Sequence, residues 1–272
     1  MEQFLFHNNG NGTFSERALD AGVALSDNGK PFAGMGVDFR DYDNDGRPDI
    51  VVTDLARQIY AMYHNDGSGS FSYRSLQTGL GVLSAASSGW GVRLVDLNND
   101  GWKDLFVAQS HVMDNVETID PSLHYLEPPL LALNHGGRFE RVDPGTTQAV
   151  AGRGAAFGDL NNDGWPDAIL SVLGGKPLVF QNHGGTAHWL TLSLRGTRSN
   201  RDGFGARVQV NGQWQEVNSA GSYLSASDKR VHFGLGPAQT ANVEIWWPSG
   251  AHQVLENVRV DQFLNVTEAE RP

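Results

Sequence analysis

The stretch DYDNDGRPD, from Asp41 to Asp49, places four aspartates within nine residues. Two later stretches repeat its design, DLNNDGWKD (Asp96 to Asp104) and DLNNDGWPD (Asp159 to Asp167). Carboxylates at such short spacing repel one another unless a cation lies among them. A loop of this composition, present three times with glycine at its sixth position, therefore predicts three cation-binding turns of one kind.

The acidic loops lie between segments in which apolar residues alternate with other residues. Val37 and Phe39 precede the first loop, and Ile50 and Val52 follow it. A period of two is typical of half-buried strands and not of helices. A second pattern, N-x-G-x-G-x-F, is present as LFHNNGNGTF, MYHNDGSGSF, the shortened ALNHGGRF and the degenerate VFQNHGGTAHW. Its Asn-Gly and Asp-Gly pairs favour hairpins.

The repeat period predicts the architecture of the first part of the chain. The acidic loops begin at residues 41, 96 and 159, so the periods are 55 and 63 residues. About four short strands in each unit of about 60 residues indicate β-propeller blades. Residues 110–129, which include three prolines, interrupt the third unit and predict a long loop with one helical turn. We therefore predict propeller blades, as a partial or small propeller, in residues 1–185.

A different pattern follows residue 185. The acidic loops are absent there, and alternating segments are joined by turn pairs at Asn211-Gly212 and Ser249-Gly250. Short alternating strands with tight turns indicate a small β-sandwich or barrel. The predicted fold class is thus all-β, with a second domain in residues 186–270.

Composition limits the possible partners. The chain of 272 residues has 31 acidic and 20 basic residues, a formal charge of −11, which disfavours nucleic acid and anionic membranes as partners. It has no cysteine, so disulfides and thiolate chemistry are excluded. No apolar stretch reaches the length of a membrane span, and the first residues do not form a signal peptide.

Calcium is the cation that suits these loops. Ca²⁺ accepts six to eight oxygen ligands at about 2.3–2.6 Å in irregular geometry. The side chains at positions 1, 3, 5 and 9 can converge on one ion if the glycine at position 6 allows a sharp turn, and position 7 offers its carbonyl. An EF-hand would need Glu at position 12, where this chain has Val52, Val107 and Leu170. The predicted ligands of about three Ca²⁺ ions are Asp41, Asp43, Asp45, Arg47, Asp49, Asp96, Asn98, Asp100, Trp102, Asp104, Asp159, Asn161, Asp163, Trp165 and Asp167.

Two further expectations follow from the loop pattern. The first loop has four carboxylates, whereas Asn98 and Asn161 reduce the others to three, so we expect the first loop to bind Ca²⁺ most tightly. Side chains at even positions, such as Asn44 and Leu97, are expected to point away and to vary freely. The alternative is that all three loops are acidic turns in contact with solvent and hold no metal.

The two sets of motifs resemble known families. The acidic loops with their N-x-G-x-G-x-F partners resemble FG-GAP/VCBS repeats, the blades of integrin-type β-propellers. In that family the positions that match Asp41, Asp43, Asp45 and Asp49 bind calcium. The segments NRDGFGARVQV, GSYLSASDKRVHFGLG and VEIWWPSG look like the ASPIC/UnbV domain, which follows such repeats in cartilage acidic protein-like proteins and in many bacterial secreted proteins.

The resemblance also implies an organisation and a location. Propellers of this family have about seven blades and an export signal, so we expect an N-terminally truncated chain; a compact four-bladed ring is the alternative. The expected location is secreted, extracellular or periplasmic, although no signal peptide is visible in this chain.

The resemblance implies a calcium-binding module for adhesion to a protein or glycan ligand. The alternative is an enzyme or accessory protein of natural-product biosynthesis, as in UnbV-like proteins, with a pocket near His111. No catalytic motif is present in the sequence, so we predict no catalytic residues.

Overall fold

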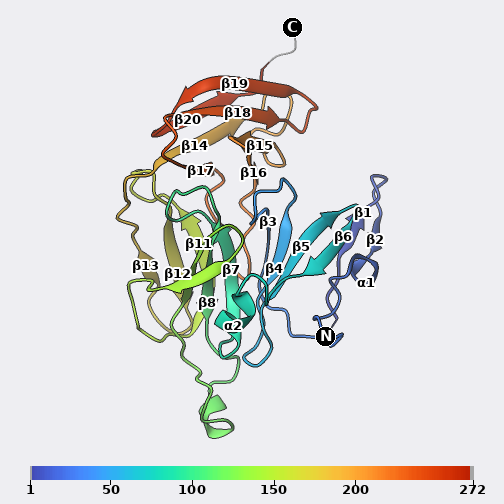
Figure 1. Cartoon of the computed structure of the whole chain (residues 1–272), viewed down its shortest axis with the longest axis vertical. Helices are drawn as coiled ribbons and strands as arrows, with labels where there is room; N and C mark the ends of the chain where they lie inside the picture. The colour runs from blue at the N-terminus through green and yellow to red at the C-terminus, as the bar shows by residue number, and fades with distance from the viewer. Residues whose placement is uncertain (1, 270–272) are drawn as a thin grey trace.

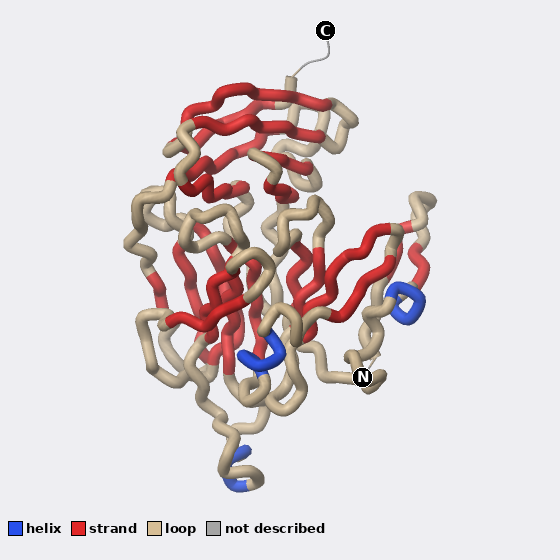
Figure 2. The backbone as a smooth tube through the Cα atoms, viewed as in Figure 1, coloured by secondary structure: helices blue, strands red, loops and turns tan. Residues whose placement is uncertain are grey.

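Short strands, most of them paired antiparallel, are the main regular elements of the protein, as the computed structural model shows (Figures 1 and 2). The structure describes residues 2–269; residue 270, the end of the predicted second domain, lies outside that range. The helical elements are short: α1 (Ala18–Ala21), α2 (Leu80–Ser84) and the 3-10 helix η1 (Val116–Thr118). The predicted all-β fold class is confirmed.

Three blade-like sheets follow one another along the chain. The first has the order β3-β4-β5-β6, the second β10-β9-β8-β7 and the third β11-β12-β13. Their strands are β3 (Val37–Arg40), β4 (Asp49–Val52), β5 (Ala61–Gly67), β6 (Ser70–Tyr73), β7 (Gly89–Val95), β8 (Asp104–Gln109), β9 (Leu130–Asn134), β10 (Phe139–Val142), β11 (Gly152–Gly158), β12 (Asp167–Val172) and β13 (Leu178–Phe180). Each acidic loop joins the first two strands of its sheet, as the sequence predicts.

A separate hairpin, β1 (Phe6–Asn8) and β2 (Phe14–Glu16), precedes the first sheet. It lies at one end of the array of sheets, and β13 lies at the other end (Figure 1). The described strands therefore do not form the four-bladed ring that was the alternative.

Neighbouring sheets pack face to face through apolar side chains. Val51 and Met62 of the first sheet share a core with Leu105 and Val107 of the second. Phe106 points to the other face of β8, because successive side chains of a strand alternate, and packs with Leu170 of the third sheet. All six residues of β8 are buried, so this strand is covered on both faces.

The first strand of the array departs from the predicted burial. Val37 and Phe39 are each 52% exposed, whereas Asp38 and Arg40 between them are buried. Asp38 accepts a hydrogen bond from the Leu94 backbone N–H and pairs with Arg40 Nε at 3.3 Å. The alternation correctly predicts a strand, but the polar residues occupy the packed face because they have partners there.

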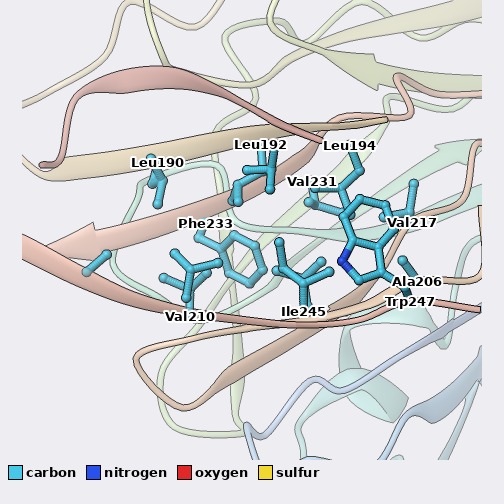
Figure 3. Packing of buried hydrophobic residues seen from close by; sticks show 14 of the residues in the cluster. Leu190, Leu192, Leu194, Ala206, Val210, Val217, Val231, Phe233, Ile245 and Trp247 are labelled. Carbon is cyan, nitrogen blue, oxygen red and sulfur yellow. The ribbon is translucent and has the colours of Figure 1, made fainter. Parts of the chain in front are cut away.

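The C-terminal strands form two further sheets, with orders β17-β14-β20 and β16-β15-β18-β19. They enclose a core that includes Leu192, Phe233 and Ile245 (Figure 3). We call these strands the C-terminal sheets: β14 (His188–Arg195), β15 (Arg207–Val210), β16 (Gln213–Glu216), β17 (Val231–Gly236), β18 (Thr240–Trp246), β19 (His252–Arg259) and β20 (Gln262–Thr267). Asn211-Gly212 and Ser249-Gly250 lie in the turns β15–β16 and β18–β19, as expected.

The C-terminal sheets and the loop of residues 110–129, which we call the insertion, lie at opposite ends of the molecule. The sheets sit over one end of the blade-like sheets, and the loop of residues 110–129, with η1, protrudes from the other end (Figure 1). This placement brings the C-terminal sheets close to the three acidic loops.

Candidate metal centres

Each acidic loop is folded tightly around its own carboxylates. In the first loop, Asp41 accepts hydrogen bonds from the backbone N–H groups of Asp45 (3.1 Å) and Gly46 (2.9 Å), and Asp45 accepts one from Arg47 N–H (2.8 Å). The glycine at position 6 has φ between 88° and 93° in all three loops, a conformation that glycine adopts without strain.

The second and third loops repeat this pattern. Asp96 Oδ2 accepts a hydrogen bond from Gly101 N–H at 2.8 Å, and Asp159 Oδ2 accepts one from Gly164 N–H at 2.7 Å. The three loops are therefore copies of one turn, with the position 1 carboxylate buried in each.

The position 9 aspartates also connect two parts of their own sheet, a structural role that the sequence does not reveal. Asp49, Asp104 and Asp167 are almost fully buried. In each, one carboxylate oxygen accepts a hydrogen bond from position 2 of its own loop, and the other accepts one from the asparagine of the neighbouring N-x-G turn. These aspartates therefore tie the acidic loop to the next strand of the same sheet.

The asparagines of the N-x-G turns link neighbouring sheets. Asn134 Nδ2 donates to Lys103 O in its own sheet and to Tyr42 O of the first loop, at 3.0 and 2.8 Å. Asn182 Nδ2 makes the matching bond to Leu97 O of the second loop at 2.7 Å. In the sequence these asparagines are visible as hairpin signals; their recurrence beside every acidic loop is the signal that points to this second role.

Position 4 side chains reach out of their own loop toward a neighbouring element, but the expectation that they vary freely is wrong. Asn44, Asn99 and Asn162 occupy this position, all with φ near 60°. Asn44 Nδ2 donates to Gly101 O of the second loop at 2.9 Å, and Asn99 Nδ2 donates to Gly164 O of the third at 3.1 Å. Position 4 is asparagine because this residue tolerates the left-handed conformation and its amide reaches the next loop.

Burial and mutual repulsion make the carboxylates costly as bare anions. Burial raises the pKa of Asp49 to about 8, that of Asp104 to about 8 and that of Asp96 to about 7. Asp96 Oδ1 is buried and has no hydrogen-bond partner among the described residues. An oxygen-rich site with an unused buried carboxylate oxygen fits a hard divalent cation.

Lys103 lies buried beside the carboxylates of the first two loops, and its pKa is lowered overall by that burial. It is 3% exposed, and burial lowers its pKa while Asp41 and Asp96 raise it. Its ammonium nitrogen has no hydrogen-bond partner in the part of the chain that the structure describes. The sequence analysis did not single out this residue, because a lysine next to acidic residues usually lies in solvent.

The first loop differs from the other two in its close neighbours. Arg47 pairs with Asp45 through its guanidinium and donates to Asn65 O at 2.6 Å. His64 of β5 lies among the carboxylates of the same loop, and the sequence analysis did not identify it as a site residue. The expected order of calcium affinity remains a prediction. The Arg47 guanidinium opposes it, because its charge offsets that of the extra carboxylate.

His111, around which a catalytic pocket was considered, has a structural setting. It is 6% exposed, and its Nδ1 accepts a hydrogen bond from the backbone N–H of Met113 at 3.1 Å. The backbone N–H of His111 donates to Tyr125 O at 3.0 Å. These bonds fold the beginning of the insertion back on itself.

Family comparisons agree with both sets of motifs. The model of the FG-GAP-like repeat matches residues 3–52 and 41–107, and that of ASPIC and UnbV matches residues 196–272. Mouse and human cartilage acidic protein 1 are each 29% identical over 97% of this chain. The chain spans about two fifths of the length of these relatives, 41% and 40%.

More distant similarities are local or weak. Mouse integrin alpha-7 is 32% identical over 35% of this chain and 8% of its own length. A solved structure of an Agrocybe aegerita lectin covers 67% of this chain and 47% of its own, with 19% identity and a TM-score of 0.37, which is too low to support an argument. Among the described residues, no helix is long and apolar enough to span a membrane.

Proposed function

Because the chain carries FG-GAP-like repeats followed by an ASPIC and UnbV domain, we propose that it is a calcium-stabilised adhesion module. In this proposal it works outside the cytoplasm, in an extracellular or periplasmic space, and binds a protein or glycan ligand. Similarity to cartilage acidic protein 1 and to integrin alpha-7 supports this class of function.

The observation that carries the proposal is the recurrence of one oxygen-rich turn in three sheets. Each loop presents carboxylate or amide oxygens at positions 1, 3, 5 and 9 and has its position 1 carboxylate buried. We assign these side chains, with the carbonyls of Arg47, Trp102 and Trp165, as ligands of one Ca²⁺ per loop. Bound calcium would offset the repulsion between carboxylates and hold the hairpins at fixed positions.

Removal of calcium tests the first half of the proposal. Calcium binds the assembled loops and not the unfolded chain, so it stabilises the fold by about 2.7 kcal/mol for one site at a hundred times its Kd. We expect about three ions in isothermal titration calorimetry and a clearly lower melting temperature in excess EGTA. An unchanged melting curve would contradict the assignment.

A variant localises the effect to one loop. Asp96→Asn removes the buried position 1 carboxylate of the second loop and should reduce the number of bound ions by one. Asp114→Asn removes an exposed carboxylate from the insertion and is the matched control, with no expected change in ion number. A wild-type isotherm for Asp96→Asn would exclude the second loop as a site.

Ligand binding tests the second half. The chain, immobilised in calcium or in EGTA, is exposed to a glycan array and to a panel of purified extracellular-matrix proteins. We expect saturable binding to at least one class of ligand, weakened in EGTA and in Asp96→Asn. If the calcium-loaded chain binds none of them above the level of a heat-denatured sample, the adhesion proposal fails even where calcium binding holds.

A further inference from the structure

His64 places an imidazole inside the first acidic loop. The side chain comes from β5, the third strand of the first sheet, and is 18% exposed. Its Nδ1 lies 3.1 Å from Asp43 Oδ2 and 3.3 Å from Asp49 Oδ1. Asp43, Asp49 and His64 can each offer one ligand atom, with all of these atoms within 4.8 Å of one another.

The imidazole nitrogen that faces the carboxylates lies close to two of their oxygens but makes no hydrogen bond to either. Nδ1 is buried and makes no hydrogen bond of acceptable geometry among the described residues. A buried nitrogen without a partner is costly, so this position favours a group that can bind it.

The distances from Nδ1 to its two carboxylate neighbours fit coordination of these pairs to one small ion. Two ligands that are each about 2.1 Å from a metal lie about 3.0 Å apart in octahedral and about 3.4 Å apart in tetrahedral geometry. The two Nδ1–oxygen distances, 3.1 and 3.3 Å, fall within this interval. Both oxygens of Asp49 already accept backbone N–H bonds, but each retains a lone pair for a metal.

The other two loops lack this nitrogen. The residue before the N-x-G asparagine is His64 in the first sheet, but Leu133 in the second and Gln181 in the third. Those loops therefore keep an oxygen-only ligand set. The imidazole nitrogen is thus a feature of the first loop and not of the repeat in general.

We propose that Asp43, Asp49 and His64 form a site for a borderline divalent transition-metal ion, with Zn²⁺ as the probe. Imidazole nitrogen and carboxylate oxygen suit such ions, whereas Ca²⁺ takes oxygen ligands. The proposal deepens the proposed function, because it rests on the same loop being a cation site. It changes the chemistry of that site from calcium alone to selectivity for a metal that accepts nitrogen.

The competing explanation is an ion pair without metal. A protonated His64 could pair with Asp43 and Asp49 and neutralise part of their charge. The two explanations differ in one observable: only a metal site makes the His64 ring respond to one equivalent of Zn²⁺.

Zinc titration of the full chain tests the proposal, with calcium present so that the oxygen-only loops are filled and Zn²⁺ has to displace Ca²⁺ from the first loop. We expect one Zn²⁺ to bind per chain in isothermal titration calorimetry, and His64→Gln to weaken that step by more than about tenfold. His7→Gln is the matched control, because His7 occupies the same position of the LFHNNG copy, which has no acidic loop, and is exposed. A smaller change in His64→Gln, or an equal change in His7→Gln, would overturn the proposal.

A second measurement does not depend on a variant that must fold. In the wild-type chain with ¹⁵N-labelled histidine, one equivalent of Zn²⁺ should shift the ring nitrogen signals of a single histidine, with the pattern of Nδ1 coordination. If no ring signal shifts, the proposal is wrong. A calcium titration of the wild-type chain is run in parallel: absent calcium binding there would count against the proposed function, whereas the zinc step is scored separately.

Discussion

At the scale of single residues, the glycine at position 6 of the third loop meets two demands. Gly164 has φ of 88°, and a Cβ added there would lie 1.8 Å from Trp189 Cε2 of the C-terminal sheets. The left-handed conformation alone selects glycine or asparagine, whereas the contact with Trp189 excludes every side chain.

Replacement of two glycines separates these demands. Gly212 has a similar φ of 93°, and nothing lies within 4 Å of a Cβ added there. We expect Gly212→Ala to cost about 1 kcal/mol of unfolding free energy through backbone strain, and Gly164→Ala to cost more than about 3 kcal/mol, because strain and overpacking add. Urea denaturation of both variants measures the difference. Equal losses would show that Trp189 yields without cost.

Glu268 gives a pH-dependent contribution at the end of β20. Burial raises the pKa of Glu268. Hydrogen bonds from the Ser249 hydroxyl and from the backbone N–H groups of Ser199, Arg198 and Thr197 lower this pKa by more, so that it is about 2. Because the pKa is depressed in the folded state, this contribution is fully present above about pH 4.5 and is lost as the pH falls toward 2.

Glu268→Gln isolates this contribution from other carboxylates. It replaces charge-assisted bonds by weaker ones and should cost about 1.5–3 kcal/mol at neutral pH. The difference in unfolding free energy between wild type and variant should shrink as the pH is lowered from 4.5. Parallel stability curves down to pH 2 would contradict the assignment.

The sequence predicted the acidic side chains of the loops but not how they are held. Aspartates at positions 1, 3, 5 and 9 are visible as a pattern, and the glycine turn follows from it. His64 and Lys103 are not visible, since each depends on which strand or loop comes next to the acidic turn in space. Residues from another element can be predicted only once the pairing of elements is known.

At the scale of elements, the asparagines at position 4 join the three sheets into a series. Asn44 bonds to the second loop and Asn99 to the third. At the end of the series, Asn162 Oδ1 instead accepts a hydrogen bond from Arg230 of the C-terminal sheets at 3.0 Å. Each acidic loop is therefore in direct hydrogen-bonded contact with the next element of the series.

Asn44→Gly removes one bond of this series without backbone strain. Glycine adopts φ of 60° readily, so the expected loss is one hydrogen bond, about 1 kcal/mol, in addition to the cost of glycine flexibility. Asn257→Gly, at φ 54° on the exposed surface of the C-terminal sheets, shares only the flexibility cost and is the control. Thermal melts should place Asn44→Gly lower than Asn257→Gly; the reverse order would show that the bond does not stabilise the array.

Elements were predicted better than the faces that they bury. The strands on both sides of each acidic loop and the turns at Asn211-Gly212 and Ser249-Gly250 follow from local patterns. The degenerate fourth copy, VFQNHGGTAHW, contains the end of β13 but does not close a hairpin, because the chain continues into β14 of another sheet. Local turn signals do not reveal which sheet a strand joins.

At the scale of the whole molecule, the C-terminal sheets rest on the acidic loops. A Cβ added to Gly46 would lie 3.2 Å from Trp214 Nε1, and one added to Gly101 would lie 3.1 Å from Gln213 Nε2. His232 Nε2 lies 2.6 Å from Asn99 Oδ1, the amide that also bonds to the third loop. The surfaces that would hold calcium are thus also the surfaces on which the C-terminal sheets dock.

This arrangement predicts that cation binding and docking are linked. A loop that loses its ion regains the repulsion between its carboxylates, and its position 4 and 6 residues can then no longer present the same surface to the C-terminal sheets. The connection between the two parts, residues 181–187, is already mostly exposed, and it should become more mobile and therefore easier to cleave when they separate. We therefore expect chelation to speed proteolytic cleavage of this connection and to increase the radius of gyration in small-angle scattering.

Arg230→Ala is the comparison that separates the effect of docking from the effect of ion binding. Arg230 donates to Asn162 Oδ1 at 3.0 Å and to Asp159 O at 3.1 Å, so its removal weakens docking while every ligand of the loops remains. In calcium, the variant should be cleaved in residues 181–187 faster than wild type, at a rate closer to that of wild type in EGTA. Wild type that binds calcium but is cleaved there at the same rate with and without it would show that docking is independent of the ions in the loops. The hydrogen bonds between asparagines and backbone would then be sufficient to hold the interface in shape.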